Sequence, residues 1–357
     1  MKIVDILIVG GGIAGLSLTY FLEQTPFDFL LIEKRNEIGK YGNRVISKEA
    51  FKKMKLRKSI ILHKIKTMNF YSPSLVKLSY VFKTERGYVT NLKNVERNFY
   101  EKIQSKEDIC LGKDITEIDF KKRKAKTQKE EIIRYKYLII ACGINKGFLE
   151  KCMITVPQHV FCYAVELKDM KESTSVIFDN VFAKNFYGWI IPLPESIEIG
   201  FGSSKFFQNF RTDLFKISLF KQFKKEKIEK INAGIIPINV PPQNIKPKDY
   251  FIIGDVLGGE PLFGGSIHKA FDEAKLVAEV LSNTPENPEK KYYCIWKKTF
   301  YPVIQLQSKT RKFINSLKNE ELDKIFEDLK LQYTTPPESK GLINELFIKL
   351  ISQAGKG

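Results

Sequence analysis

The sequence is poor in cysteine, and the cysteines it has are not arranged as a site. Five cysteines occur among 357 residues, an odd number with no Cys-x-x-Cys pair. Disulfide frameworks need paired cysteines, and zinc sites show close pairs of ligands along the chain. We therefore expect no disulfide framework, no metal site and a reducing, cytoplasmic location.

Long hydrophobic runs are also missing. No apolar stretch approaches the roughly 20 residues that a membrane-spanning helix needs. The opening residues, MKIVDILIVG, pass directly into a glycine cluster and lack the pattern of a secretory signal. We expect no transmembrane segment, which leaves attachment to a membrane surface open.

Arginine is scarce although the chain is strongly basic. Lys+Arg is 59 and Asp+Glu is 41, a net charge of +18, and only nine of the basic residues are arginine. Nucleic-acid-binding modules present a recognisable fold or an arginine- and aromatic-lined face, and neither is evident here. We expect no nucleic-acid partner. The surplus lysine suits an anionic lipid surface, although a lysine-rich overall composition would explain it as well.

What is present is an ordinary globular composition with a glycine-rich opening. Hydrophobic residues make up 43% and charged residues 28%, and the length predicts two domains or one large one. The opening predicts a strand, a GxGxxG turn, a helix, a second strand and an acid, in that order. The first strand is residues 3–9, and the turn has Gly10, Gly12 and Gly15 as its glycines, with Ala14 inside the motif. The helix is residues 13–24 and the second strand residues 27–32. The acid is Glu33, and Lys34 follows it.

This order is the signature of dinucleotide binding. The glycines allow a tight turn, a close backbone approach to a pyrophosphate and tight helix–strand packing, and the acid binds ribose hydroxyls. The helix N-terminus favours the negative pyrophosphate. An acid at position 33 favours FAD or NAD over NADP, although Lys34 and Arg35 weaken that distinction. A purely structural glycine turn is the alternative.

A second glycine-rich loop lies far downstream. A short strand ends in Gly254-Asp255, and a loop ending in Gly264-Gly265-Ser266-Ile267 opens a helix that runs from His268 to about Leu281. The aspartate can accept hydrogen bonds from a ribityl chain, and the helix N-terminus can face the polar edge of a flavin. With both loops the chain resembles the FAD-binding fold shared by the aromatic hydroxylases and their relatives, and this resemblance implies FAD as the cofactor.

A third segment narrows the family. Tyr187, Trp189 and Pro192 form a Tyr-x-Trp-x-x-Pro strand, and an alternating strand ending in Gly200-x-Gly202 follows. With these motifs the chain resembles the geranylgeranyl reductases, FAD-dependent enzymes of the p-hydroxybenzoate-hydroxylase-like fold, over roughly residues 1–285. The resemblance implies hydride transfer from reduced FAD to a double bond of an isoprenoid chain. The substrate would be an archaeal-type ether lipid, a prenyl diphosphate or a polyprenyl quinone, and the electron donor NAD(P)H or ferredoxin.

Tyr187 and Trp189 are the predicted substrate-binding residues. They stand at i and i+2, so their rings point to the same side of a strand. From spacing alone a hydrophobic core face is the better explanation. The resemblance implies instead that the two rings wall a tunnel for an isoprenoid chain.

The chain departs from the family at several positions. The family's cysteine, implicated in the reduction, falls in the stretch 40–47, which here has none and offers Tyr41 or Arg44. Leu92 stands where the family has a helix arginine, and Cys142 replaces the aspartate of Ala-Asp-Gly. The catalytic residue stays unassigned, with Tyr41 and His268 as candidates, although a buried helix histidine is the simpler interpretation of His268. A flavin monooxygenase, another isoprenoid-modifying flavoprotein, or a catalytically altered flavin- or lipid-binding protein are the alternatives.

The predicted fold class is α/β, with a discontinuous Rossmann-like FAD-binding domain, an α+β substrate domain and a short helical C-terminus. The FAD-binding domain is assigned residues 1–60, 90–150 and 245–285, the substrate domain 61–89 and 151–244, and the helical region 286–357. Amphipathic helices are predicted around 206–231 and over 341–352, the latter packing on the protein or lying on a membrane.

Overall fold

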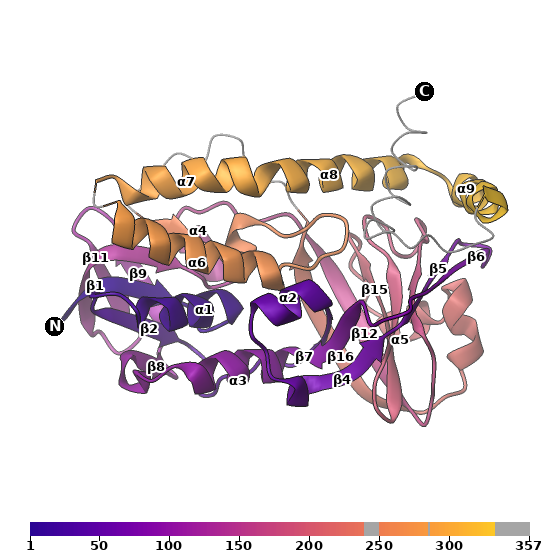
Figure 1. Ribbon diagram of the computed structural model, residues 1–357, viewed down its shortest axis with the longest axis horizontal. Coiled ribbons are helices and arrows are strands. Elements are labelled where there is room, and N and C mark those ends of the chain that lie inside the picture. The colour runs from indigo at the N-terminus through magenta and orange to yellow at the C-terminus, as the bar shows by residue number, and fades with distance from the viewer. Residues whose placement is uncertain (239–249, 285, 333–357) are drawn as a thin grey trace.

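The computed structural model describes residues 1–238, 250–284 and 286–332. Its first large sheet has the order β8-β2-β1-β11-β10-β9, and β17 pairs with β11 (Figure 1). Strands β1, β2, β8, β11 and β17 run parallel, whereas β10 is antiparallel to β9 and β11. Their bounds are β1 Lys2–Val9, β2 Phe29–Glu33, β8 Ile109–Leu111, β9 Ile115–Asp119, β10 Lys124–Thr127, β11 Ile132–Ile140 and β17 Phe251–Ile252.

Helices cover this sheet because its central strands are apolar on both faces. The side chains of Ile6, Leu7 and Ile8 in β1 are fully buried. Parallel strands of this kind need helices on their faces. Helix α1 contacts both α3 and α6, and α7 contacts α6 and leads into α8. The bounds are α1 Ile13–Leu22, α3 Leu92–Lys102, α4 Lys146–Lys151, α6 Ile267–Asn283, α7 Pro288–Thr299, α8 Tyr301–Ser316 and α9 Asn319–Gln332.

The second large sheet has the order β16-β12-β15-β14-β13-β5-β6 and lies at the opposite end of the molecule in Figure 1. All its pairs are antiparallel except β13 with β5. One of its faces packs a core that includes Val165, Phe201 and Phe220. The bounds are β5 Thr67–Tyr71, β6 Lys77–Val81, β12 His159–Lys168, β13 Thr174–Ile177, β14 Gly188–Pro192, β15 Ser196–Ser203, β16 Ile228–Pro237, α5 Phe210–Leu214 and the short 3-10 helix η3 Ser218–Phe223.

A small sheet, β3-β7-β4, joins the two large ones. Ile46 and Tyr88 belong to the core of the first sheet, whereas Ile65 and Val89 pack with Ile191 of β14. The bounds are β3 Asn43–Ser47, β4 Ile61–Ile65, β7 Gly87–Asn91, α2 Lys48–Lys53, and the 3-10 helices η1 Lys58–Ile60, η2 Lys106–Asp108 and η4 Gly254–Leu257. This small sheet sets the distance between the glycine loops and the second sheet.

The predicted α/β fold class is confirmed, with one wrong element. The amphipathic helix expected around 206–231 is replaced by α5, η3 and the start of β16. Residues 228–231 pair with β12 as the start of β16, and α5 and η3 instead pack Leu214 and Phe220 into the core of the second sheet. The helix expected over 341–352 lies outside the described residues, and the domain boundaries stay a prediction. Within the described ranges no helix is long and apolar enough to cross a membrane.

Candidate cofactor and substrate site

A cavity of about 810 Å³ lies between the glycine loops of the first sheet and one face of the second. Fourteen of the sequence-predicted site residues line it, so the fold brings together segments more than 200 positions apart. They are Gly10, Gly12, Ala14, Glu33, Lys34, Tyr187, Trp189, Gly254, Asp255, Gly264, Gly265, Ser266, Ile267 and His268. Gly15 and Tyr41 are not among the lining residues.

The glycines of the first loop meet different constraints. Gly10 has φ +112°, and an added Cβ would lie 2.5 Å from the Ala141 oxygen. A Cβ on Gly15 would lie 1.9 Å from the Gly10 oxygen. Both positions are therefore restricted by the packing of the chain itself. A Cβ on Gly12 would meet only Glu96 Oε1, at 3.8 Å, so the protein leaves space there that its own packing does not require. This cradle fits a bound pyrophosphate.

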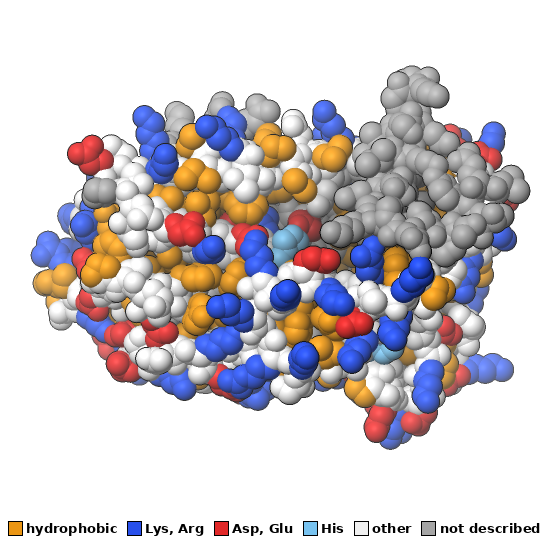
Figure 2. Space-filling view, viewed as in Figure 1, with side chains coloured by type: hydrophobic (Ala, Val, Ile, Leu, Met, Phe, Trp, Pro, Cys, Tyr) orange, Lys and Arg blue, Asp and Glu red, His pale blue; other side chains and the backbone are white. Residues whose placement is uncertain are grey.

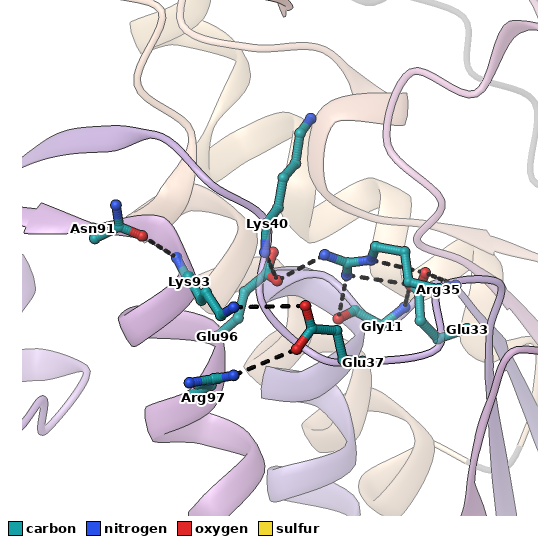
Figure 3. A network of polar contacts seen from close by, with 9 residues as sticks. All are labelled: Gly11, Glu33, Arg35, Glu37, Lys40, Asn91, Lys93, Glu96 and Arg97. Carbon is teal, nitrogen blue, oxygen red and sulfur yellow. Dashed lines mark hydrogen bonds and ion pairs between the residues drawn. The ribbon is translucent and has the colours of Figure 1, made fainter. Parts of the chain in front are cut away.

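Glu33 is held at the loop by Gly11 and Arg35 (Figure 3). Its Oε2 accepts from the Gly11 N–H at 2.6 Å, and its Oε1 accepts from the backbone N–H and Nε of Arg35, each at 2.9 Å. Burial opposes ionisation of Glu33, but the hydrogen bonds and charge of Arg35 outweigh it and lower the pKa of the carboxyl. Glu33 is thus a fixed, charged acceptor beside the loop.

Arg35 also links this loop to helix α3. Its Nη1 donates to Glu96 Oε2 at 3.0 Å, its Nη2 donates to the Gly11 oxygen at 3.1 Å, and the Lys40 N–H also donates to Glu96 at 2.9 Å. Burial raises the pKa of the Glu96 carboxyl. The hydrogen bonds from Arg35 and Lys40 and the charge of Arg35 lower it, but they offset the effect of burial only in part. Arg97, by contrast, pairs with Glu37 away from the loop (Figure 3). Sequence reasoning missed Glu96, whose only signal was an acid on a buried helix face.

The second loop brings a turn and a helix start to the cavity. Gly254 and Gly264 have positive φ, +72° and +67°, and the Gly254 N–H donates to the buried Glu273 Oε2 at 2.7 Å. The Ser266 hydroxyl, just before α6, is buried and has no hydrogen-bond partner among the described residues. An orphaned buried hydroxyl needs an external partner. The polar atoms here therefore also fit a bound cofactor.

The rings of Tyr187 and Trp189 lie against each other on the opposite wall. Their centroids are 6.2 Å apart, in an edge-to-face arrangement. The Tyr187 hydroxyl donates to the Phe263 oxygen at 2.6 Å, and Trp189 Nε1 donates to Glu198 Oε1 at 3.1 Å. Each ring is thus fixed by a polar contact at one edge while its apolar face lines the cavity. Glu198, which holds Trp189, is another residue that sequence reasoning missed.

Comparisons with known proteins agree with this geometry. The family model of the pyridine nucleotide-disulphide oxidoreductases matches residues 4–177. A digeranylgeranylglycerophospholipid reductase of Methanocaldococcus jannaschii is 26% identical over 91% of this chain and 90% of its own length. A digeranylgeranylglycerophospholipid reductase 2 of Methanothermobacter thermautotrophicus is 22% identical over 91% of both. A geranylgeranyl bacteriochlorophyll reductase-like protein from Thermoplasma acidophilum has a TM-score of 0.83 and 19% identity over 99% of this chain and 96% of its own.

Over about nine tenths of its length the chain is thus similar to proteins named digeranylgeranylglycerophospholipid reductase. The match to the oxidoreductase family model and these similar proteins confirm two predictions, that the protein is an oxidoreductase and that its cofactor is FAD. A probable FAD-dependent monooxygenase from Pseudomonas aeruginosa has the same fold, with a TM-score of 0.68 and 13% identity over 92% of this chain and 100% of its own. The aromatic-hydroxylase-like fold is therefore shared across different reactions, and the site must decide between them.

The two residues suggested as catalytic candidates lie in different places. His268 is exposed in the first turn of α6, so the interpretation as a buried helix histidine is wrong. Its Nε2 lies 2.9 Å from Glu260 Oε1. This hydrogen bond raises the pKa of the imidazole despite an opposing effect of burial. Tyr41 donates to Glu166 Oε2 at 3.2 Å and does not line the cavity.

Three of the positions at which the chain differs from the geranylgeranyl reductase pattern line the cavity, whereas Tyr41 does not. Arg44, Leu92 and Cys142 are among its lining residues. Burial raises the pKa of the Cys142 thiol to about 12, so the thiol is neutral. A neutral thiol is a weak nucleophile, so Cys142 is poorly suited to replace the cysteine that the stretch 40–47 lacks.

Proposed function

We propose that the protein is an FAD-dependent reductase of double bonds in an isoprenoid chain. The observation that carries this proposal is the continuity of one cavity from the two glycine loops to an apolar wall. The side chains of that wall come from the second sheet and the segment before β14: Met68, Phe70, Val176, Phe186, Ile190 and Ile236. A cleft with this lining suits a long hydrocarbon ligand.

The polar half of the cavity suits the cofactor. Gly12, Ala14, Glu33 and Lys34 would hold the adenosine and pyrophosphate half of FAD, and Asp255 with residues 264–267 would hold the ribityl chain and the flavin edge. When bound in its reduced form, FAD supplies a hydride to one carbon of the double bond.

The apolar wall has the task of positioning the substrate. Tyr187 and Trp189 would lie against the isoprenoid chain and keep water out, because their polar edges are already bound to Phe263 and Glu198. Rings with fixed positions hold a flexible isoprenoid chain near the geometry in which it reacts. This lowers the entropic part of the activation free energy. We further propose that the substrate carries a geranylgeranyl group on a polar head, as an ether phospholipid, a diphosphate or a quinone, and that NAD(P)H or ferredoxin supplies the electrons.

An anaerobic assay on the FAD-loaded protein tests this function. The flavin is reduced with dithionite, and a geranylgeranyl phospholipid or diphosphate is added. We expect flavin reoxidation and a mass gain of about 2 Da for each reduced double bond. The Trp189→Ala variant should lower the rate, whereas Phe206→Ala, an exposed ring (70%) of the same region, should not.

Three results would contradict the proposal. Flavin that stays reduced in the presence of every isoprenoid tested would favour a catalytically altered flavin- or lipid-binding protein. Oxygen-dependent reoxidation with a hydroxylated product would favour a monooxygenase. Protein that remains colourless with added FAD would mean that the glycine loops are only structural.

A further inference from the structure

Reduction of a double bond needs a proton as well as a hydride, and the following inference rests on the proposed function. Among the described residues six carboxyl groups line the cavity: Glu33, Glu96, Asp114, Glu198, Asp255 and Glu260. Glu33 and Glu96 are engaged with Arg35, and Glu260 with His268. Glu198 is the one acid of this set that belongs to the second sheet, on the same wall as the apolar side chains.

Three side chains from three strands hold the Glu198 carboxyl in place. Trp189 Nε1 of β14 donates to Oε1 at 3.1 Å, Asn43 Nδ2 of β3 donates to Oε2 at 3.0 Å, and Asn232 Nδ2 of β16 donates to Oε2 at 3.5 Å. The side chain is 4% exposed in the middle of β15, where every residue is buried. The carboxyl is therefore fixed in the cavity wall, beside the ring that is proposed to contact the substrate.

The charges around Glu198 come from two other strands. Burial is the largest influence and raises the pKa of its carboxyl; Trp189, Arg44 of β3 and Asn43 lower it, and Glu166 of β12 raises it. The Cys162 thiol, also on β12, has a pKa raised by burial to about 12 and is neutral. The net effect on Glu198 is a raised pKa, so the carboxyl keeps its proton at a higher pH than an exposed glutamate does.

We propose that Glu198 is the catalytic acid that protonates the second carbon of the double bond. The π bond is lost as one C–H bond forms with the hydride and the other with the proton. The O–H bond of Glu198 breaks and its electron pair stays on the carboxylate. The hydride brings two electrons to the alkene, and reduced FAD is the co-reactant that supplies it. Water then returns a proton to Glu198.

The other groups near the cavity are less suited to this task. The Tyr187 hydroxyl is engaged with Phe263, and burial raises its pKa above the ordinary value. The Cys142 thiol is held neutral by a pKa of about 12. The stretch 40–47 has no cysteine that could supply the proton. Its Asn43 donates a hydrogen bond to Glu198.

The Glu198→Gln variant tests the assignment. It keeps the size of the side chain but removes the acid. We expect flavin reoxidation by the isoprenoid substrate to slow by about 100-fold or more, as for loss of a general acid. The substrate affinity of the oxidised enzyme, followed by the flavin absorbance, should change little. Glu198→Asp keeps an acid at a greater distance and should recover part of the rate.

Glu166→Gln is the matched control. Glu166 stands directly opposite Glu198 in the β12–β15 pair but does not line the cavity. Its removal should keep the maximal rate and move the pH profile to lower pH, because the nearby negative charge that raises the Glu198 pKa is gone. An equal loss of rate in both variants would overturn the assignment, since it would indicate a structural effect on this strand pair.

A second readout does not depend on turnover. A folded-state pKa above the ordinary 4.5 means that protonated Glu198 stabilises the fold below that value and that this contribution is lost as the pH rises through the raised pKa. The free energy of unfolding of the wild type, relative to Glu198→Gln, should therefore fall with rising pH. A difference that does not change with pH would contradict a retained proton and overturn the assignment.

The outcomes separate this inference from the proposed function. A wild type that reduces the isoprenoid, together with a fully active Glu198→Gln, overturns the role of Glu198 alone. A loss of substrate affinity that accounts for the whole loss of rate also overturns it, because Glu198 would then act by holding Trp189. A wild type that reduces no isoprenoid overturns the proposed function itself.

Discussion

At the scale of single residues, the glycines of the first loop differ in what requires them: the packing of the chain itself or the space for a bound ligand. Gly10 and Gly15 are required by contacts within the chain, because a Cβ on either would overlap backbone atoms. Gly12 has no such conflict in the described structure, so its small size serves what occupies the adjoining cavity. This distinction cannot be drawn from the GxGxxG pattern, in which the three glycines look equivalent.

Gly12→Ala should therefore weaken cofactor binding without damaging the fold. We expect an unchanged melting temperature of the FAD-free protein and FAD affinity lowered by about 10-fold or more, because an added methyl group in a filled site costs about 1–3 kcal/mol. Titration of FAD into the variant, followed by fluorescence, measures the effect. Gly147→Ala is the control, since a Cβ there meets nothing within 4 Å. Normal FAD affinity in Gly12→Ala would mean that the cofactor does not use this cradle.

At the scale of elements, one buried carboxylate ties three segments together behind the second loop. Glu273 of α6 accepts from Lys269 Nζ at 2.7 Å, from Trp296 Nε1 of α7 at 2.6 Å, and from the Gly254 N–H at 2.7 Å. The carboxylate is fully buried. It therefore fixes the turn that carries Asp255 to the helices that cover the first sheet.

Glu273→Ala should destabilise the protein strongly. Removal of one partner of a buried ion pair leaves Lys269 uncompensated, which costs about 3–5 kcal/mol. Urea denaturation measures the loss, and Glu273→Gln, which keeps an oxygen for the Gly254 N–H, should preserve more FAD affinity than Glu273→Ala. Lys275→Ala breaks the exposed pair with Glu279 and should cost at most about 1 kcal/mol. Equal losses of unfolding free energy in the Glu273→Ala and Lys275→Ala variants would show that the buried network stabilises the protein no more than an exposed ion pair does.

At the scale of the whole molecule, the net charge of +18 reflects 59 basic against 41 acidic side chains. Figure 2 shows lysine and arginine side chains distributed over the visible face, interspersed with hydrophobic and acidic ones. A distributed field acts on an extended partner more than on a small ligand, and an anionic membrane surface is an extended partner of this kind.

We expect the protein to co-sediment with vesicles that contain anionic phospholipid and much less with vesicles of neutral phosphatidylcholine. The binding should weaken with added salt, because the screening length falls from about 10 Å at 0.1 M to about 3 Å at 1 M. Neutral vesicles at the same salt concentrations are the control. Equal binding to both kinds of vesicle would exclude an electrostatic attachment.

Local patterns were sufficient for the elements and for the cofactor. The apolar run 3–9, the glycines and Glu33 predicted β1, the turn before α1 and an acid at the end of β2, because the period of a buried strand and the steric needs of a tight turn are local properties. The same locality explains the error at 206–231. There the competing interactions are the ladder between β12 and β16 at 228–231 and the burial of Leu214 and Phe220 in the second sheet's core. Contacts with distant strands leave no local trace.

From the sequence alone, two glycine loops and an aromatic strand lead to an FAD-dependent oxidoreductase that resembles the geranylgeranyl reductases. Which side chains share one cavity depends on how distant segments of the chain pack together. The tertiary structure left Tyr41 outside, exposed His268 beside Glu260, and buried Glu198 among donors from β3, β14 and β16. The reason is physical, because the burial and protonation of a carboxyl depend on neighbours brought from remote parts of the chain.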